Sequence, residues 1–182
     1  MKPPDIRTLT EADIARHTPA LIGLLIDVVD SGGSVGFLPP VSDAAARRYW
    51  TEVRALVASG VRVLVGAFVD HSLVGAVQLD LAQMPNAVHR AEVMKLLVHR
   101  DARGRGLARA LMMALEDAAR VHHRNLIVLD TRAGDSAEKL YTSLGYLKAG
   151  VVPGWAKSAN GTMHNTAVMY KALTAETSNV KL

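Results

Sequence analysis

The chain has 182 residues, of which 49% are hydrophobic, and its formal net charge is +4. This length suits one domain with a full core, and the hydrophobic content is typical of a globular rather than a disordered protein. The lack of cysteine excludes disulfides, thiolate–metal sites and an acyl-cysteine intermediate. Aromatic residues are only 4% of the chain, so the scattered basic residues come with few stacking platforms, and no nucleic-acid partner is expected.

No segment of the sequence predicts export or membrane insertion. Residues 1–10 lack the apolar segment of a signal peptide, and the longest apolar runs, 20–26 and 61–69, are too short to span a bilayer. We therefore expect a cytoplasmic protein with no membrane association. We also expect a single domain over residues 1–182, in which 173–182 form a flexible tail.

The first half of the chain is predicted to form one strand, then two helices, then three strands. The first helix begins at Thr10 or Asp13, because either side chain can cap a helix and apolar residues then recur on one face. A glycine-rich loop at 31–37 ends this helix, and a second helix begins at Ser42 or Asp43. The predicted strands of this half are 5–9, 61–69, 73–81 and 89–98.

The second half continues with a helix, a strand, a helix and two strands. Leu107, Leu111 and Leu115 recur at helical spacing, and a shorter helix begins at Asp135 or Ser136. The predicted strands of this half are 125–131, 146–151 and 166–173. The order is therefore β-α-α-β-β-β-α-β-α-β-β, and the strand–helix–strand crossover around the first of these helices implies parallel pairing inside a mixed sheet.

The turn between the apolar strand at 93–98 and the following helix carries the clearest chemical signal. The first N–H groups of a helix have no partner within the helix, and the helix dipole makes this end positive. Small residues in the turn would let a phosphate approach the backbone, so the turn is a candidate pyrophosphate site. A Walker loop would end in Gly-Lys-Ser/Thr, and a dinucleotide-binding loop would have a third glycine where Arg109 stands.

The pattern that does fit is Arg/Gln-x-x-Gly-x-Gly/Ala, met by Arg103, Gly106 and Ala108. This segment resembles the acetyl-coenzyme A signature of the GNAT superfamily of N-acetyltransferases, and the element order is similar too. The resemblance implies an α/β fold with a mixed, mostly antiparallel sheet flanked by helices, acetyl-CoA as acyl donor, and no metal. The residues implied to contact the coenzyme are Leu96, Leu97, Val98, Arg103, Gly104, Arg105, Gly106, Leu107, Ala108 and Tyr141.

Three segments carry a closer resemblance, to the tabtoxin-resistance acetyltransferases: 32–37, 90–98 and 129–146. It implies acetyl transfer to a primary amine of a small molecule, such as a β-lactam toxin or an antibiotic. Acetylation of a protein or peptide amine, and a non-catalytic acyl-CoA-binding regulatory domain, are the alternatives. A homodimer is compatible with the sequence, which identifies neither the acceptor nor the acyl length.

Three side chains are candidates for the chemistry of acetyl transfer. An alkylammonium must lose a proton before it attacks a thioester, and Glu92 and Asp130 stand at or near ends of two strands predicted to be parallel. The residues alone do not decide which carboxylate is the base. The resemblance implies that Tyr141 protonates the departing thiolate. One departure from the superfamily is Gly134, which stands where many of its members carry an asparagine.

Overall fold

The computed structural model describes residues 3–173 of the chain. Its elements follow the predicted order, with one short 3-10 helix, η1, added before the turn at 103–106. The elements are β1 (Asp5–Thr8), α1 (Glu11–Asp30), α2 (Asp43–Ala58), β2 (Arg62–Val69), β3 (Ser72–Leu81), β4 (Arg90–Val98), η1 (Arg100–Ala102), α3 (Leu107–Val121), β5 (Leu126–Arg132), α4 (Ser136–Ser143), β6 (Leu147–Lys157) and β7 (Met163–Ala172). Thr10 caps α1 in a capping box with Asp13, and Ser42 caps α2.

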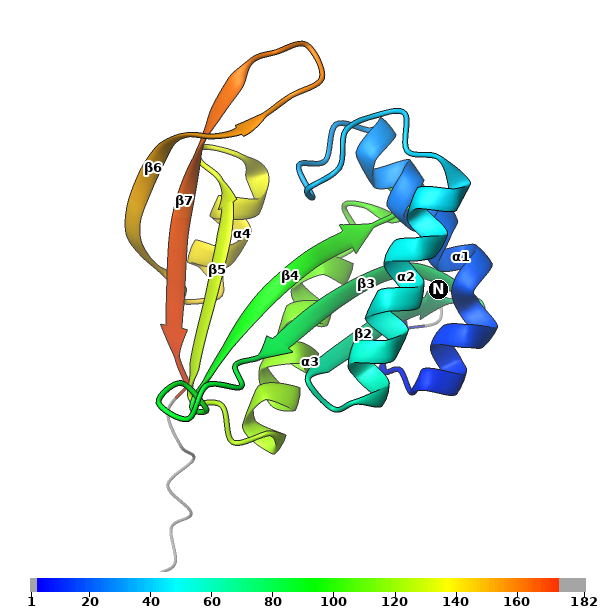
Figure 1. The fold of residues 1–182 in the computed structure, drawn as a ribbon, viewed down its shortest axis with the longest axis horizontal. Coiled ribbons are helices and arrows are strands. Elements are labelled where there is room, and N and C mark those ends of the chain that lie inside the picture. Colours follow the sequence, from blue (N-terminus) through cyan, green and yellow to red (C-terminus); the bar gives the residue numbers. More distant parts are fainter. Residues whose placement is uncertain (1–2, 174–182) are drawn as a thin grey trace, which may run out of the picture.

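The seven strands form one sheet in the order β1-β2-β3-β4-β5-β7-β6. All pairs are antiparallel except β4 with β5, so the predicted mixed, mostly antiparallel sheet is confirmed. Figure 1 shows α1 and α2 on one face of the sheet and α3 on the other. Side chains alternate along β2, so Leu64 packs into the α1–α2 core while Val63 and Val65 pack into the α3 core.

The parallel pair β4 and β5 is in register over only three positions, Arg90–Glu92 against Leu126–Val128. Beyond these positions the two strands diverge toward their carboxyl ends, as Figure 1 shows. The carboxyl-terminal half of β4 is therefore paired with β3 on one edge and has no recorded pairing with β5 on the other. This divergence positions the candidate site.

The predicted boundaries are wrong at the end of the sheet. β6 continues to Lys157 instead of ending at residue 151, and β7 begins at Met163 instead of at residue 166. The long-range pairing of the two strands outweighs the local breaker signal of Pro153 and Gly154. The register shifts across these two residues, which accommodates them as an irregularity rather than as a strand end.

The prediction of a flexible tail over 173–182 is wrong for its first residue. Leu173 is buried, and its N–H donates to the carbonyl oxygen of Asn125 at 2.8 Å. The remainder of that prediction, 174–182, lies outside the described residues. Between residues 3 and 173, no helix has both the length and the apolar character needed to cross a bilayer.

Gly75 in β3 is a position where the packing admits no side chain. A Cβ there would lie 3.1 Å from Leu111 Cδ1 and 3.1 Å from the carbonyl oxygen of Leu97. We expect Gly75→Ala to lower the free energy of unfolding by about 1–3 kcal/mol, because the backbone and a fully buried leucine must both shift. Gly150→Ala in β6 is the matched control, since nothing lies within 4 Å of its Cβ. Urea denaturation of both variants measures the difference, and equal midpoints would contradict this account of the packing.

Candidate active site

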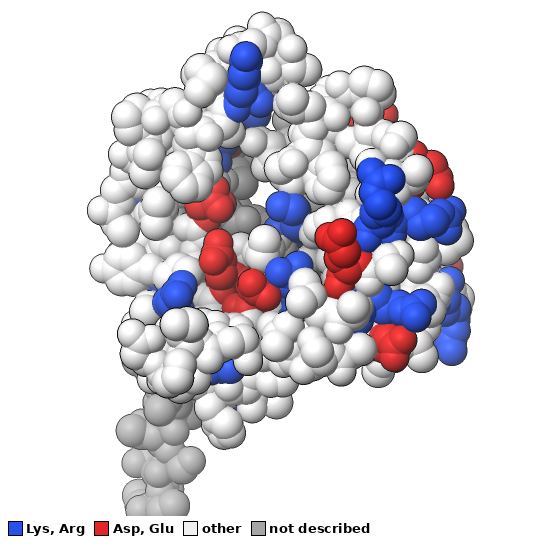
Figure 2. All heavy atoms as spheres, viewed as in Figure 1, with Lys and Arg blue, Asp and Glu red and all other residues white. Residues whose placement is uncertain are grey.

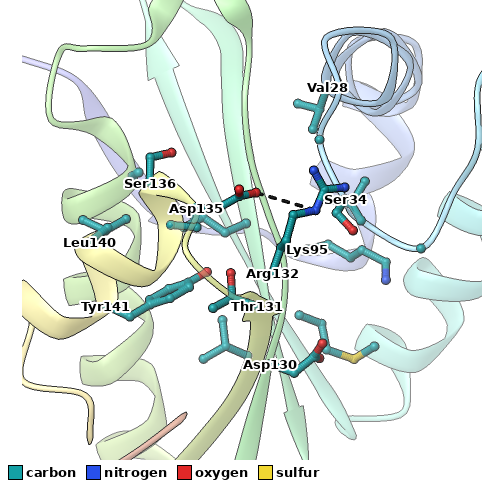
Figure 3. Close-up of a pocket in the computed structure, with 18 of the residues that line it drawn as sticks. Val28, Ser34, Lys95, Asp130, Thr131, Arg132, Asp135, Ser136, Leu140 and Tyr141 are labelled. Atoms are coloured by element: carbon teal, nitrogen blue, oxygen red, sulfur yellow. Dashed lines mark ion pairs between the residues drawn. The ribbon is translucent and has the colours of Figure 1, made fainter. Parts of the chain in front are cut away.

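A pocket of about 690 Å³ opens where β4 and β5 diverge. Its walls come from the loop after α1, the second half of β4, the end of β5, the start of α4 and the β6–β7 hairpin. Figure 2 shows this face of the molecule, where acidic and basic side chains lie close together around a hollow. Figure 3 shows Tyr141, Leu140, Ser136 and Asp135 on one side of the pocket, with Lys95 and Ser34 across from them.

Strand β4, which lines the pocket, carries a β-bulge in its pairing with β3. Gln78 pairs with Met94 and Ala76 with Leu97, so the single residue between them on β3 faces two on β4, Lys95 and Leu96. Lys95 has a φ of 50°, in the left-handed region that lysine rarely adopts. Leu96 and Val98 both line the pocket, while Leu97 is buried in the core. An extended amide chain could add to this unpaired edge as a further strand would.

Glu92 and Asp130 both line the pocket, and neither makes an ion pair among the described residues. Arg132, a plausible neighbour for Asp130 in sequence, instead approaches Asp135 at 3.8 Å. Burial raises the pKa of the partly buried Glu92 carboxyl, and the nearby carboxylates of Asp130 and Asp80 raise it further. A carboxylate with a raised pKa is a stronger base than an ordinary glutamate.

The side chain of Tyr141 is buried on α4, and Figure 3 shows its hydroxyl directed toward the pocket. Its ring packs edge-on against Tyr146 with the centroids 5.8 Å apart, which fixes the position of the ring. Burial raises the pKa of the Tyr141 hydroxyl to about 12, with a further contribution from Asp130. The hydroxyl is therefore protonated at neutral pH, as a proton donor must be.

The turn that leads into α3 is shaped by two glycines. Gly104 and Gly106 have φ angles of 75° and 78°, and nothing lies within 4 Å of a Cβ built on either. The conformation, rather than a lack of space, therefore requires glycine here. No side chain caps α3, so the first N–H groups of the helix remain available to an anion. This arrangement fits a pyrophosphate group.

Hydrogen bonds from two arginines tie this turn to the end of α1. Arg103 Nη2 donates to Ser31 Oγ at 2.6 Å, and Arg103 Nε donates to the carbonyl oxygen of Val98 at 3.0 Å. Arg100 forms an ion pair with Asp27, and these bonds hold the pKa of the Asp27 carboxyl below its usual value despite its partial burial. The guanidinium of Arg103 thus supports the turn and the strand edge together.

The pocket brings together most of the residues singled out in the sequence. Glu92, Asp130 and Tyr141 line it. Besides Tyr141, four of the residues implied to contact the coenzyme also line it: Leu96, Val98, Arg103 and Ala108. The side chain of Leu107 is buried in the core, as that of Leu97 is. Gly104, Arg105 and Gly106 are exposed in the turn outside the pocket lining.

Sequence reasoning missed the contribution of Lys95, whereas it named Trp155 and Phe37 as candidate apolar walls of the pocket. Lys95 lines the pocket, and the sequence offers no sign of the bulge that directs it there. Trp155 lines the pocket with 58% of its surface exposed, whereas Phe37 packs against Tyr49 with ring centroids 5.3 Å apart. Among residues 3–173, no group of three or more metal-ligating side chains lies close enough together to hold a metal ion.

Comparison with known proteins gives matches in sequence. The sequence profile described as the acetyltransferase (GNAT) family matches residues 35–146, more than half of the chain. A protein of Azospirillum brasilense, named an uncharacterized N-acetyltransferase in the hisH-hisA intergenic region, is 31% identical over 108 residues. The match covers 58% of this chain and 62% of that protein, so this chain spans less than two thirds of its curated relative.

Solved structures match nearly the whole chain. The ribosomal-protein-alanine N-acetyltransferase from Brucella melitensis is 25% identical, with a TM-score of 0.76, over 93% of this chain and 99% of that one. A protein of Salmonella typhimurium, described as an acetyltransferase with its cofactor acetyl-CoA, has a TM-score of 0.75 at 18% identity, over 96% of each chain. At 18% identity, the similarity to the Salmonella typhimurium structure shows a shared fold and no more.

Proposed function

Because this chain belongs to the acetyltransferase (GNAT) family, whose members take their acetyl group from acetyl-CoA, we propose that it acetylates a primary amine of a small molecule by direct transfer. The observation that carries this proposal is the pocket between β4 and β5. It combines two carboxylates, a protonated phenol and an unpaired strand edge within one hollow.

The residues present fit the coenzyme. The unpaired edge of β4 at Leu96 and Val98 suits the amides of the pantetheine arm, and the N–H groups of the turn at 103–108 suit the pyrophosphate. Bound there, acetyl-CoA supplies an activated acetyl group on sulfur. Because the chain has no cysteine, no acyl-cysteine intermediate can form, which supports direct transfer to the acceptor amine.

The described side chains divide the proton transfers between them. Glu92 accepts the proton of the incoming ammonium, for which its raised pKa suits it. Asp130 holds the ammonium by charge and keeps the pKa of Glu92 high. Tyr141 donates its hydroxyl proton to the departing sulfur, since burial keeps the phenol protonated. These roles make Glu92 the general base and Tyr141 the general acid.

We further propose a small polar acceptor, such as a β-lactam toxin or an antibiotic. The support is that the three segments similar to the tabtoxin-resistance acetyltransferases all contribute to the pocket: 32–37 through Ser34, 90–98 through Lys95, and 129–146 through Tyr141. A peptide amine is the competing acceptor, because one similar structure is named a ribosomal-protein-alanine N-acetyltransferase.

The test is release of free thiol from acetyl-CoA in the presence of a panel of amines, with coenzyme binding measured by calorimetry in the same samples. The panel contains tabtoxinine-β-lactam, aminoglycosides, diamines, diamino acids and a peptide with N-terminal alanine. We expect release with small amines. Release with the peptide alone would overturn the small-molecule acceptor, and coenzyme binding without any release would indicate a non-catalytic domain.

A further inference from the structure

Lys95 is the one charged side chain on the bulge of β4, and its backbone is strained. A lysine at a φ of 50° costs free energy that the surrounding structure must offset. Bulges next to ligand sites redirect a side chain that regular alternation would place elsewhere. Here the bulge places Lys95 in the lining of the pocket, on the side opposite Tyr141 (Figure 3).

The ammonium of Lys95 has no partner among residues 3–173. Three basic side chains line the pocket, and two of them are engaged: Arg132 with Asp135, and Arg103 with Ser31 and with the Val98 carbonyl. Lys95 makes no ion pair and no hydrogen bond within that part of the chain, although it is partly buried. A buried charge without a partner is unfavourable, so an anion supplied by a ligand would be held there.

The loop after α1 passes close to this ammonium. A Cβ at Gly36 would lie 3.2 Å from Lys95 Nζ, so a side chain at this position would crowd the charge. Gly36 has a φ of 81°, which also favours glycine. The loop and Lys95 therefore line the pocket together. Burial lowers the pKa of Lys95, and Asp130 and Glu92, which carry negative charge in the same lining, act in the opposite direction.

We propose that Lys95 is the anchor of a carboxylate subsite, so that the acceptor is an amino-acid-like zwitterion whose carboxylate binds Lys95 while its reacting amine faces Glu92 and Asp130. This inference rests on the proposed function and names the substrate class of the same pocket. The two charge types within one lining match the two charges of such a molecule. Charge pairing of this kind fixes the orientation of the acceptor.

The test uses pairs of acceptors that differ by one carboxylate and share the same amine. The pairs are 2,4-diaminobutyrate with 1,3-diaminopropane, ornithine with 1,4-diaminobutane, and lysine with 1,5-diaminopentane. In at least one pair we expect the acid to be preferred by tenfold or more in kcat/KM, as expected for a charge-assisted hydrogen bond (roughly tenfold or above). Equal kcat/KM values within every pair would overturn the proposal.

Variants of Lys95 separate its charge from its shape. Lys95→Met is expected to abolish the preference for the acid, largely through KM, while Lys95→Arg keeps most of it. Lys139→Met is the control, because Lys139 is exposed on α4 outside the pocket lining, and it should behave as wild type. A preference that survives in Lys95→Met would overturn the proposal.

Gly36→Ala tests the subsite without touching the lysine. Its methyl group would lie 3.2 Å from Lys95 Nζ, so the ammonium must shift, and we expect the preference for the acid to fall several-fold. Gly60→Ala, just after α2 and outside the pocket lining, has comparable left-handed strain, with a φ of 74°, and nothing lies within 4 Å of its Cβ, so it should keep the ratio of the pair. Equal ratios in the two glycine variants would contradict the contact with Lys95.

Failure of the proposed function has a separate signature. If no amine releases thiol, calorimetric titration of the coenzyme-loaded protein with each acid and its diamine still measures the subsite. Tighter binding of the acid, lost in Lys95→Met, would support the subsite even without turnover. Equal or undetectable binding of both members would overturn it.

Discussion

Replacing Tyr141 with phenylalanine is expected to lower kcat by about 10²–10⁴-fold, the range typical of a lost general acid. The hydroxyl is the only group removed. Because the ring stays packed edge-on against Tyr146, the fold and the binding of the coenzyme should be unchanged. Burial holds the pKa of the hydroxyl at about 12, so in the wild type it is available as a donor throughout the neutral range.

The measurement combines steady-state kcat with calorimetric binding of coenzyme A. Tyr146→Phe is the matched control, since Tyr146 is buried beside Tyr141 but does not line the pocket, and its kcat should stay near that of wild type. A Tyr141→Phe enzyme with wild-type kcat would show that the proton reaches the sulfur from water.

Glu92→Gln and Asp130→Asn are expected to change the pH profile of kcat/KM in different ways. In the wild type the base must be deprotonated, so activity rises with pH through the raised pKa of Glu92. Glu92→Gln should remove this acidic limb and lower kcat/KM by about 10²–10⁴-fold. Asp130→Asn should move the limb to lower pH, because it removes a negative charge that raises the pKa of Glu92.

The two variants together assign the base. A limb that disappears in Asp130→Asn and persists in Glu92→Gln would reverse the two roles. An unchanged profile in both would exclude direct proton transfer to either carboxylate. Asp117→Asn on the exposed face of α3 is the control for the general effect of removing one negative charge, and it should leave the limb in place.

Local signals in the sequence were enough for the order of elements and for the turn before α3. Capping side chains placed the first helix start at Thr10 or Asp13 and the second at Ser42 or Asp43, and the structure has Thr10 and Ser42 as the caps. Gly104 and Gly106 readily adopt the left-handed conformation that this turn has. These features depend on a few neighbouring residues. The spacing of Arg103, Gly106 and Ala108 in this turn indicated the family, and the match of the family's sequence profile to residues 35–146 shows it.

Long-range pairing decided what local signals could not. β6 continues through Pro153 and Gly154 because β7 pairs with it on both sides of the irregularity, and no local pattern records that partner. Leu173 is buried for the same reason, since the core that covers it comes from distant parts of the chain. The two strands at the end of the sheet, β6 and β7, were therefore predicted too short.

Within the site, the sequence specifies which chemical groups are present, whereas the folded sheet sets their arrangement. Glu92 and Asp130 could be singled out from their places near strand ends, and Tyr141 from the resemblance to the GNAT superfamily; their roles remain predictions. That Lys95 joins them while Leu97 turns into the core depends on one extra residue in β4, opposite β3. A bulge reverses the side-chain alternation beyond it, and it forms only when two strands pair, so only the folded sheet determines which residues of β4 face the pocket.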